Sequence, residues 1–84
     1  MAKGVQTDLT KAVVRRINEL CKQKKWSYYK LAGEAGLSTG TLAAIMDGST
    51  KKVQLHTVKA ICDAFDITLA TFFNVAYFEH LPMD

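Results

Sequence analysis

Apolar residues recur at helical spacing along almost the whole chain, and nothing before the C-terminus breaks the pattern. Near the start the spacing is i, i+4, i+7 and i+8, which describes one face of a helix with 3.6 residues per turn; it is made by Val13, Ile17, Leu20 and Cys21. The single proline, Pro82, lies in the tail, and strand-like alternation is almost absent. The pattern therefore predicts an all-α fold.

Capping residues and glycines divide this pattern into five expected helices. Thr7 or Asp8, then Ser27, Ser38 and Thr68, have side-chain oxygens that can accept hydrogen bonds from first-turn N–H groups. Gly36 and Gly48 can stop helices in the left-handed conformation that glycine enters cheaply. We expect helices over about residues 9–24, 28–35, 38–47, 55–65 and 69–73, with Leu55 on the apolar face of the fourth.

The length of the chain limits how much it can enclose. Its 84 residues fit one domain, and an apolar content of 49% can fill a small core. A domain this small leaves little room for a deep substrate pocket. We expect a single domain over residues 1–84, with an N-terminal arm (1–7), a helical body (8–74) and an apolar C-terminal tail (75–84).

The motifs of metal sites and enzymes are missing from the sequence. Cys21 and Cys62 form no CxxC pair, and His56 and His80 have no metal-ligand spacing. No nucleophile elbow, phosphate-binding loop or carboxylate pair occurs. We expect no enzyme, no metal, no cofactor and no small-molecule substrate. Without a signal-like start or a long apolar run, we expect a cytoplasmic protein that does not engage membranes.

Charge is distributed unevenly along the chain. Residues 1–30 contain eight Lys or Arg against Asp8 and Glu19, a balance of +6, whereas residues 31–84 contain three lysines against six acids, a balance of −3. A basic face would attract polyanions such as nucleic acid. The alternative is an ordinary solvated lysine face.

A more specific pattern lies within residues 28–47. Small and apolar residues occur there at fixed spacing: Leu31, Ala32, Ala35, Gly36, Leu42 and Ile45. This pattern resembles the helix-turn-helix of the lambda-repressor and Cro family. In that family a small residue lets the two helices cross closely, a glycine makes the turn, and an apolar pair anchors the second helix. The resemblance extends over about residues 9–74 and implies a compact five-helix domain.

The resemblance also implies a function. It predicts a repressor-type transcriptional regulator that binds double-stranded DNA, with residues 38–47 as the recognition helix in the major groove and with two copies forming a homodimer. The candidate DNA-contacting residues come from the two motif helices and the following loop: Tyr28, Tyr29, Ser38, Thr39, Gly40, Thr41, Ala43, Ala44, Lys51 and Lys52. The hydroxyl of Tyr28 is expected to donate to a phosphate, and Arg15 or Arg16 to flank the loop.

The chain departs from the family pattern in two places. The arginine and glutamate that often pair beneath the motif correspond here to Cys21 and Met46, an exchange of both partners that keeps the core apolar. The recognition helix lacks the Arg, Asn or Gln side chains that make bidentate base contacts, so direct readout should be modest. Gly40 either permits close approach to DNA or is simply a tolerated exposed glycine.

The tail and the recognition helix leave alternatives open. Val75, Tyr77, Phe78 and Leu81 bring more apolar surface than a free terminus exposes. They either pack on the fourth and fifth helices of their own domain or meet a two-fold partner. The apolar recognition helix also fits a second class of function, a protein-interaction module such as an antitoxin or regulatory adaptor on the same scaffold.

Overall fold

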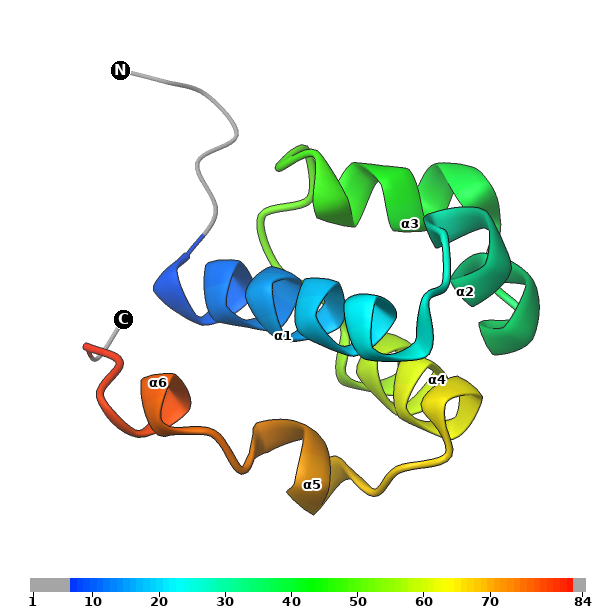
Figure 1. The fold of residues 1–84 in the computed structure, drawn as a ribbon. Coiled ribbons are helices and arrows are strands. Elements are labelled where there is room, and N and C mark those ends of the chain that lie inside the picture. Colours follow the sequence, from blue (N-terminus) through cyan, green and yellow to red (C-terminus); the bar gives the residue numbers. More distant parts are fainter. Residues whose placement is uncertain (1–6, 83–84) are drawn as a thin grey trace.

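A computed structural model describes residues 7–82, which form six helices and no strand (Figure 1). The helices are α1 (Asp8–Lys24), α2 (Tyr28–Ala35), α3 (Thr39–Met46), α4 (Leu55–Phe65), α5 (Leu69–Phe73) and α6 (Ala76–Glu79). The long α1 crosses the molecule, with α3 on one side of it and α5 and α6 on the other. The all-α prediction and its five helices are confirmed, and α6 is an addition. Apart from Thr7, the expected N-terminal arm lies outside the described residues.

Local hydrogen bonds explain where the helices begin. The hydroxyl of Thr7 accepts from the backbone N–H of Thr10 at 3.1 Å, so Thr7 is a cap rather than part of an arm. The hydroxyls of Ser27, Ser38 and Thr68 accept in the same way at the starts of α2, α3 and α5. Each cap satisfies a first-turn N–H that has no carbonyl partner within its helix. The expected caps are therefore confirmed.

Left-handed residues end the first, second and fourth helices. Gly36 has φ 70° at the end of α2, and Gly48 has φ 92° just after α3, as expected. Lys25 and Asp66 also adopt φ 60°, at the ends of α1 and α4. Asp66 therefore turns the chain where α4 ends. After each of these two non-glycine residues comes a partly buried apolar side chain, which returns the chain to the core.

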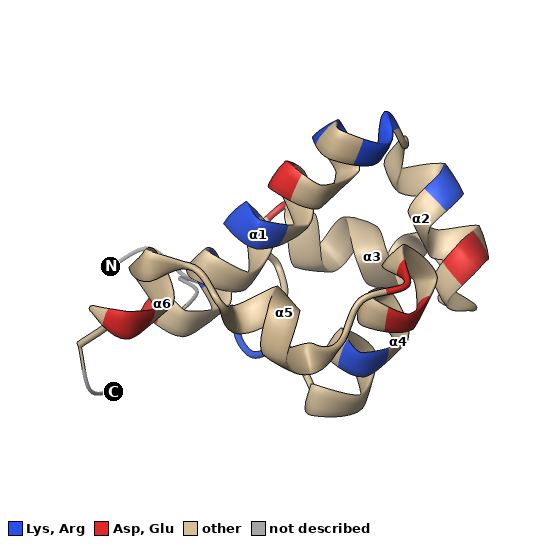
Figure 2. Cartoon of the chain, turned by 60° about the horizontal axis from the view of Figure 1, so that its bottom comes forward, with Lys and Arg blue, Asp and Glu red and all other residues tan. Residues whose placement is uncertain are grey.

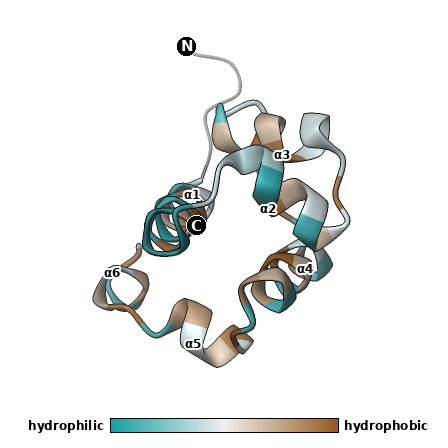
Figure 3. Ribbon diagram, turned by 45° about the vertical axis from the view of Figure 1, so that its right-hand side comes forward, coloured by the Kyte–Doolittle hydropathy of each residue, from teal (hydrophilic) through white to brown (hydrophobic). Residues whose placement is uncertain are grey.

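One apolar core fills the space between α1, α2, α3, α4 and α5. The ribbon of α1 carries both hydrophilic and hydrophobic residues, as expected for a helix with one buried face (Figure 3). Trp26 covers one end of the core, stacked on Phe65 with ring centroids 5.2 Å apart. The buried apolar side chains that make up this core are Val13, Ile17, Leu20, Cys21, Leu31, Ala32, Leu42, Ile45, Val58, Ile61, Cys62, Phe65 and Phe72. Leu55 is absent from this set. It is 69% exposed, so its expected place on the inner face of the fourth helix was wrong.

The apolar tail folds back on its own domain. Its helix α6 packs on α1, and the ring of Phe78 lies edge-on to that of Phe73 with centroids 4.9 Å apart. Tyr77 reaches α1, where its hydroxyl donates to Glu19 Oε1 at 2.7 Å. The tail therefore packs on α1 and α5, whereas the intramolecular alternative that we considered named the fourth and fifth helices.

Candidate nucleic-acid interface

The α2 and α3 helices form a compact pair around a short turn. Ala32 is 1% exposed, and its small side chain lets the two helices pack closely. Gly36 ends α2, and the next residue, Leu37, donates its backbone N–H to the carbonyl of Ala32 at 2.9 Å. Leu42 and Ile45 are buried and fix the inner face of α3. This arrangement holds the other face of α3 toward solvent.

The outer face of α3 is made of small, uncharged residues. Thr39, Gly40, Thr41 and Ala43 are exposed, and Ala44 is half-buried. In Figure 2 the α3 ribbon carries no charged residue. Because these side chains are short, the surface of a binding partner can come close to the backbone of the helix.

Hydroxyl groups are already paired at the start of α3. The hydroxyl of Ser38 accepts from the backbone N–H of Thr41 at 3.0 Å and donates to the Thr41 hydroxyl at 2.8 Å. Ser38 is therefore occupied by capping. Thr41 accepts this bond and keeps its own O–H as a donor, so its side chain remains able to bind a base or a phosphate oxygen.

The start of α2 presents two aromatic rings. Tyr29 is 79% exposed and Tyr28 is 44% exposed. The Tyr28 hydroxyl donates to the side-chain carbonyl of Asn18 on α1. Our expectation that this hydroxyl donates to a phosphate conflicts with that bond, because a hydroxyl has only one proton to donate. No sequence pattern indicated the bond to Asn18, which depends on how α1 and α2 meet.

The loop between α3 and α4 carries exposed basic groups on a well-fixed backbone. Lys51 and Lys52 are both exposed. Before them, Asp47 accepts from the backbone N–H of Ser49 at 2.8 Å. Hydrogen bonding from the side chain of Ser49, and then from its backbone, holds the pKa of the Asp47 carboxyl below its usual value. The backbone N–H of Thr50 donates to the carbonyl of Ala44 at 2.9 Å. The loop thus holds its lysines beside α3.

An open hollow of about 490 Å³ joins the starts of α3 and α4 to this loop. Ser38 and Thr41 line it from α3, Lys52 from the loop, and His56 and Thr57 from α4. The N-terminal ends of two helices, each with partial positive charge, therefore face one space beside a lysine. Such a surface favours an anionic ligand.

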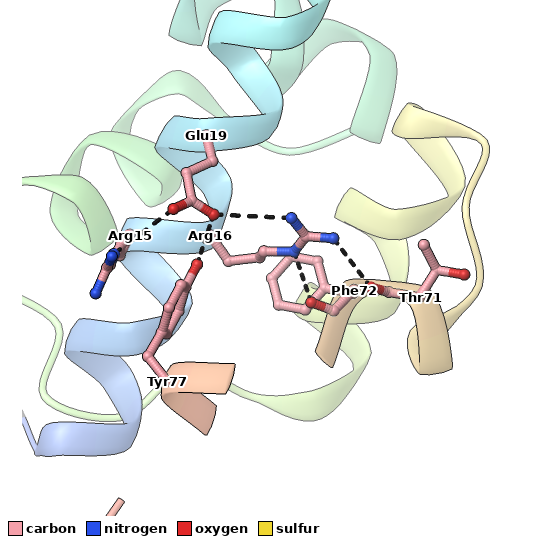
Figure 4. A network of polar contacts seen from close by, with 6 residues as sticks. All are labelled: Arg15, Arg16, Glu19, Thr71, Phe72 and Tyr77. Atoms are coloured by element: carbon pink, nitrogen blue, oxygen red, sulfur yellow. Dashed lines mark hydrogen bonds and ion pairs between the residues drawn. The ribbon is translucent and has the colours of Figure 1, made fainter. Parts of the chain in front are cut away.

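The two arginines of α1 lie elsewhere, which corrects our expectation that they flank the loop. Arg16 is 8% exposed and donates to the carbonyls of Phe72 at 2.7 Å and Thr71 at 3.0 Å (Figure 4). Arg15 lies 4.0 Å from the centre of the Tyr77 ring, and its Nε is 3.6 Å from Glu19 Oε2. Both therefore serve the contact of α1 with α5 and α6. The charge count alone could not reveal that either arginine contacts α5 or α6.

Basic residues instead gather where α1 meets α2. Lys22, Lys24 and Lys25 lie at the C-terminal end of α1, and Lys30 follows on α2 (Figure 2). Among the described residues the first three make no ion pair, whereas Lys30 pairs with Glu34 at 3.1 Å. Part of the predicted basic face thus exists, next to the start of α2.

Within residues 7–82, no group of three or more His, Cys, Asp or Glu side chains is arranged to hold a metal ion. The described helices include none with the length and apolar character needed to cross a membrane.

The fold and the exposed face of α3 together define a helix-turn-helix domain. Residues 16–76, more than half of the chain, match the family model of the Cro/C1-type HTH DNA-binding domain. The chain therefore belongs to the Cro/C1-type HTH DNA-binding family. Neither the curated proteins nor the solved structures include a match to it.

Proposed function

We propose that the chain is a cytoplasmic, repressor-type transcriptional regulator that places residues 38–47 in the major groove of DNA as a homodimer. The observation that carries the proposal is the α2–α3 pair, which buries Leu42 and Ile45 and leaves the opposite face of α3 exposed beside a lysine-bearing loop. Binding and regulation in this proposal need no enzymatic activity.

Affinity would come chiefly from phosphate contacts. Lys51 and Lys52, with the N-terminal ends of α2 and α3, are the groups we assign to the DNA backbone. Tyr29 is the exposed aromatic ring available beside them, because Tyr28 donates its hydroxyl to Asn18. These contacts position the protein on the duplex without reading its sequence.

Sequence preference would come from α3. The threonine hydroxyls can bond to base edges, and the methyl groups of Thr39, Thr41, Ala43 and Ala44 can pack on thymine methyls. None of these side chains makes a bidentate contact, so we propose a modest preference in which Gly40 lets the helix backbone come close to the bases.

The test is a titration of duplex DNA at rising salt. With about four to six phosphate contacts per dimer, the logarithm of affinity should fall against the logarithm of salt concentration with a slope of roughly −4 to −5. Replacing Lys51 and Lys52 by alanine should weaken binding to all sequences alike. It should also flatten the slope by about one unit for each phosphate that the variant no longer neutralises.

A control and an alternative outcome complete this experiment. Lys59 pairs with Asp63 on the outer face of α4, so Lys59→Ala should leave the slope unchanged. Absence of DNA binding at low salt would contradict the proposal. It would favour the protein-interaction module instead, for which the uncharged outer face of α3 is the supporting observation.

A further inference from the structure

Two exposed leucines mark a surface that neither the core nor the proposed DNA interface explains. Leu9 and Leu55, which are 47% and 69% exposed, come from α1 and α4 and line one groove. The other large apolar side chains exposed among the described residues, Tyr28 and Tyr29, stand at the start of α2. Exposing a leucine costs free energy because water must surround its apolar surface, so a ligand that covers both leucines would be stabilised in this groove.

The groove has the size and lining of a small-molecule site. It is an open space of about 550 Å³ between the start of α1, the start of α4 and the end of α5. Ligand pockets commonly measure about 300 to 1,000 Å³ and are lined mainly by apolar side chains with a few polar groups. The apolar lining here consists of Leu9, Val13, Val53, Leu55, Val58 and Phe73. These side chains can bury the apolar part of a ligand.

The polar side chains that line the groove can all donate hydrogen bonds. Lys52 is exposed and makes no ion pair with any described residue. The hydroxyls of Thr7 and Thr10 lie 3.0 Å apart, and because that contact uses one hydroxyl proton, the other remains available to a ligand. Within the described residues no acid lines the groove, since the exposed Asp8 lies outside the lining. The groove therefore favours an anionic acceptor.

We propose that this groove binds a small carboxylic acid with an apolar chain. The apolar chain would lie against Leu9 and Leu55, and the carboxylate would pair with the ammonium group of Lys52. The combination selects this class of ligand, because a neutral molecule leaves Lys52 without a partner and an amine is repelled by it. The acid is bound without being changed, so the site needs no catalytic group.

Lys52 connects the groove to the proposed DNA interface, and in this respect the inference rests on the proposed function. Lys52 also lines the hollow beside α3, and we assigned it to the DNA backbone. A single ammonium group that pairs with a carboxylate in the groove is no longer available to neutralise a phosphate. The acid and DNA should therefore weaken each other's binding by the same factor. The acid would act as an effector that releases the regulator from DNA.

The first test uses octanoate as the probe and the full chain without DNA. Calorimetric titration should detect octanoate binding at concentrations too low for micelles, and amide NMR shifts should be largest at Leu9, Val53 and Leu55. The uncharged analogue 1-octanol should bind about tenfold more weakly, because it makes no ion pair with Lys52. The octylammonium cation should bind more weakly still, because Lys52 repels it.

Variants then assign the carboxylate to one lysine. Lys52→Met keeps an apolar chain of similar length and removes the charge, so it should weaken octanoate binding by about tenfold and leave 1-octanol binding unchanged. The matched control is Lys51→Met, which removes an exposed charge from the same loop outside the groove lining and should leave octanoate binding unchanged. Leu55→Ser should weaken both ligands alike. Its helix content by circular dichroism should not change, since Leu55 is exposed.

Several outcomes would overturn the inference. Binding of 1-octanol as tight as that of octanoate would show that the charge of the ligand is not recognised. Equal octanoate affinity in Lys52→Met and the wild type would place the carboxylate elsewhere. Amide shifts at Leu9 and Leu55 that follow protein concentration instead of octanoate would assign the groove to a second copy of the chain. Octanoate binding that requires deletion of residues 1–6 would assign it to the chain's own N-terminal segment.

DNA binding separates failure of this inference from failure of the proposed function. Saturating octanoate should lower the affinity of the wild type and of Lys51→Met for a duplex by about fivefold or more, and it should not change that of Lys52→Met. If octanoate binds through Lys52 but the chain binds no DNA, the groove inference stands and the regulator proposal fails. If the chain binds DNA but not octanoate, the groove inference alone fails. Octanoate binding that leaves DNA affinity unchanged would overturn the effector role.

Discussion

The α2–α3 pair and the junction of α1 with α5 and α6 use polar groups in opposite ways. At the start of α3 the hydrogen bonds join residues close together in the sequence, such as the bond from the Thr41 N–H to the Ser38 hydroxyl. The outward side chains of α3 are small. At the junction, Arg16 and Tyr77 make contacts across more than 50 residues (Figure 4). One region keeps its polar surface available, and the other uses its polar groups to hold the chain together.

The contrast shows that net charge alone does not reveal which basic side chains are left available to a ligand. Both arginines described in α1 belong to the junction, whereas the lysines of the α3–α4 loop remain exposed. An arginine can donate several directed hydrogen bonds, which suits it to cap the carbonyls of α5. A lysine keeps its compact charge in water, from which it can neutralise a phosphate.

The largest expected effect comes from removing Arg16. Arg16→Ala removes the side-chain donor of the Phe72 carbonyl, leaves the Thr71 carbonyl only the longer bond from the Asn74 N–H at 3.3 Å, and opens a gap beside α5. We expect a loss of about 3 kcal/mol in the free energy of unfolding, measured by urea denaturation. Arg15→Ala is the matched control and should cost under about 1 kcal/mol, because the Arg15 side chain is 64% exposed. Equal losses in the two variants would break the contrast between buried and solvated arginines.

A smaller effect is expected from filling Gly40. A Cβ built there would come no closer than 4.0 Å to Ser38 Oγ, so Gly40→Ala should stabilise α3 by about 1 kcal/mol. If the helix backbone closely approaches DNA, the added methyl should also weaken DNA binding by about tenfold. Thermal melting and a binding titration on the same duplex would measure both effects.

Gly33→Ala is the control for that substitution. Gly33 lies within α2 with open space around it, and it is not among the candidate contact residues. It should give a similar gain in stability and no change in DNA affinity. If both alanine variants bind DNA as the wild type does, Gly40 is only a tolerated exposed glycine.

The smallest effect concerns the pH dependence of the junction. Burial, and then the hydrogen bond to Glu19, raises the pKa of Tyr77 from 10.0 to about 12. Because the folded pKa is the higher one, the contribution of Tyr77 to stability is complete below about pH 10 and is lost as the pH rises toward about 12. In the Tyr77→Phe variant, the free energy of unfolding measured across this pH window should depend less on pH than it does in the wild type. An identical profile would place the Tyr77 hydroxyl in solvent.

Sequence patterns predicted the local features of the fold well. Ser27, Gly36 and Ser38 act on residues within four positions of themselves, so their types were enough to place both ends of α2 and the start of α3. The left-handed Lys25 and Asp66 were missed because lysine rarely adopts that conformation and aspartate, which adopts it more often, is a weaker signal for it than glycine. The available signal was the apolar residue that directly follows each of them, Trp26 after Lys25 and Ile67 after Asp66.

Features that depend on distant contacts could not be predicted in this way. Arg16 is next to the buried Ile17 in the sequence. Its side chain is buried because α5 packs nearby and offers a carbonyl acceptor. Leu55 continued the apolar spacing of α4, yet no described element covers it within the domain. The α6 helix is four residues long and has no side-chain cap, so its stability comes from packing on α1. The roles of the candidate DNA-contacting residues remain predictions for the binding experiments to test.

The two buried cysteines supply a means of timing how this domain opens. Cys21 and Cys62 are free thiols, 4% and 0% exposed, and burial raises the pKa of each, so alkylating reagents should react slowly while the chain is folded. Alkylation then follows the rate at which each thiol is released to solvent. Equal rates at Cys21 on α1 and Cys62 on α4 would describe a single cooperative opening, and a faster reaction at Cys21 would reveal that the end of α1 frays before the rest of the core.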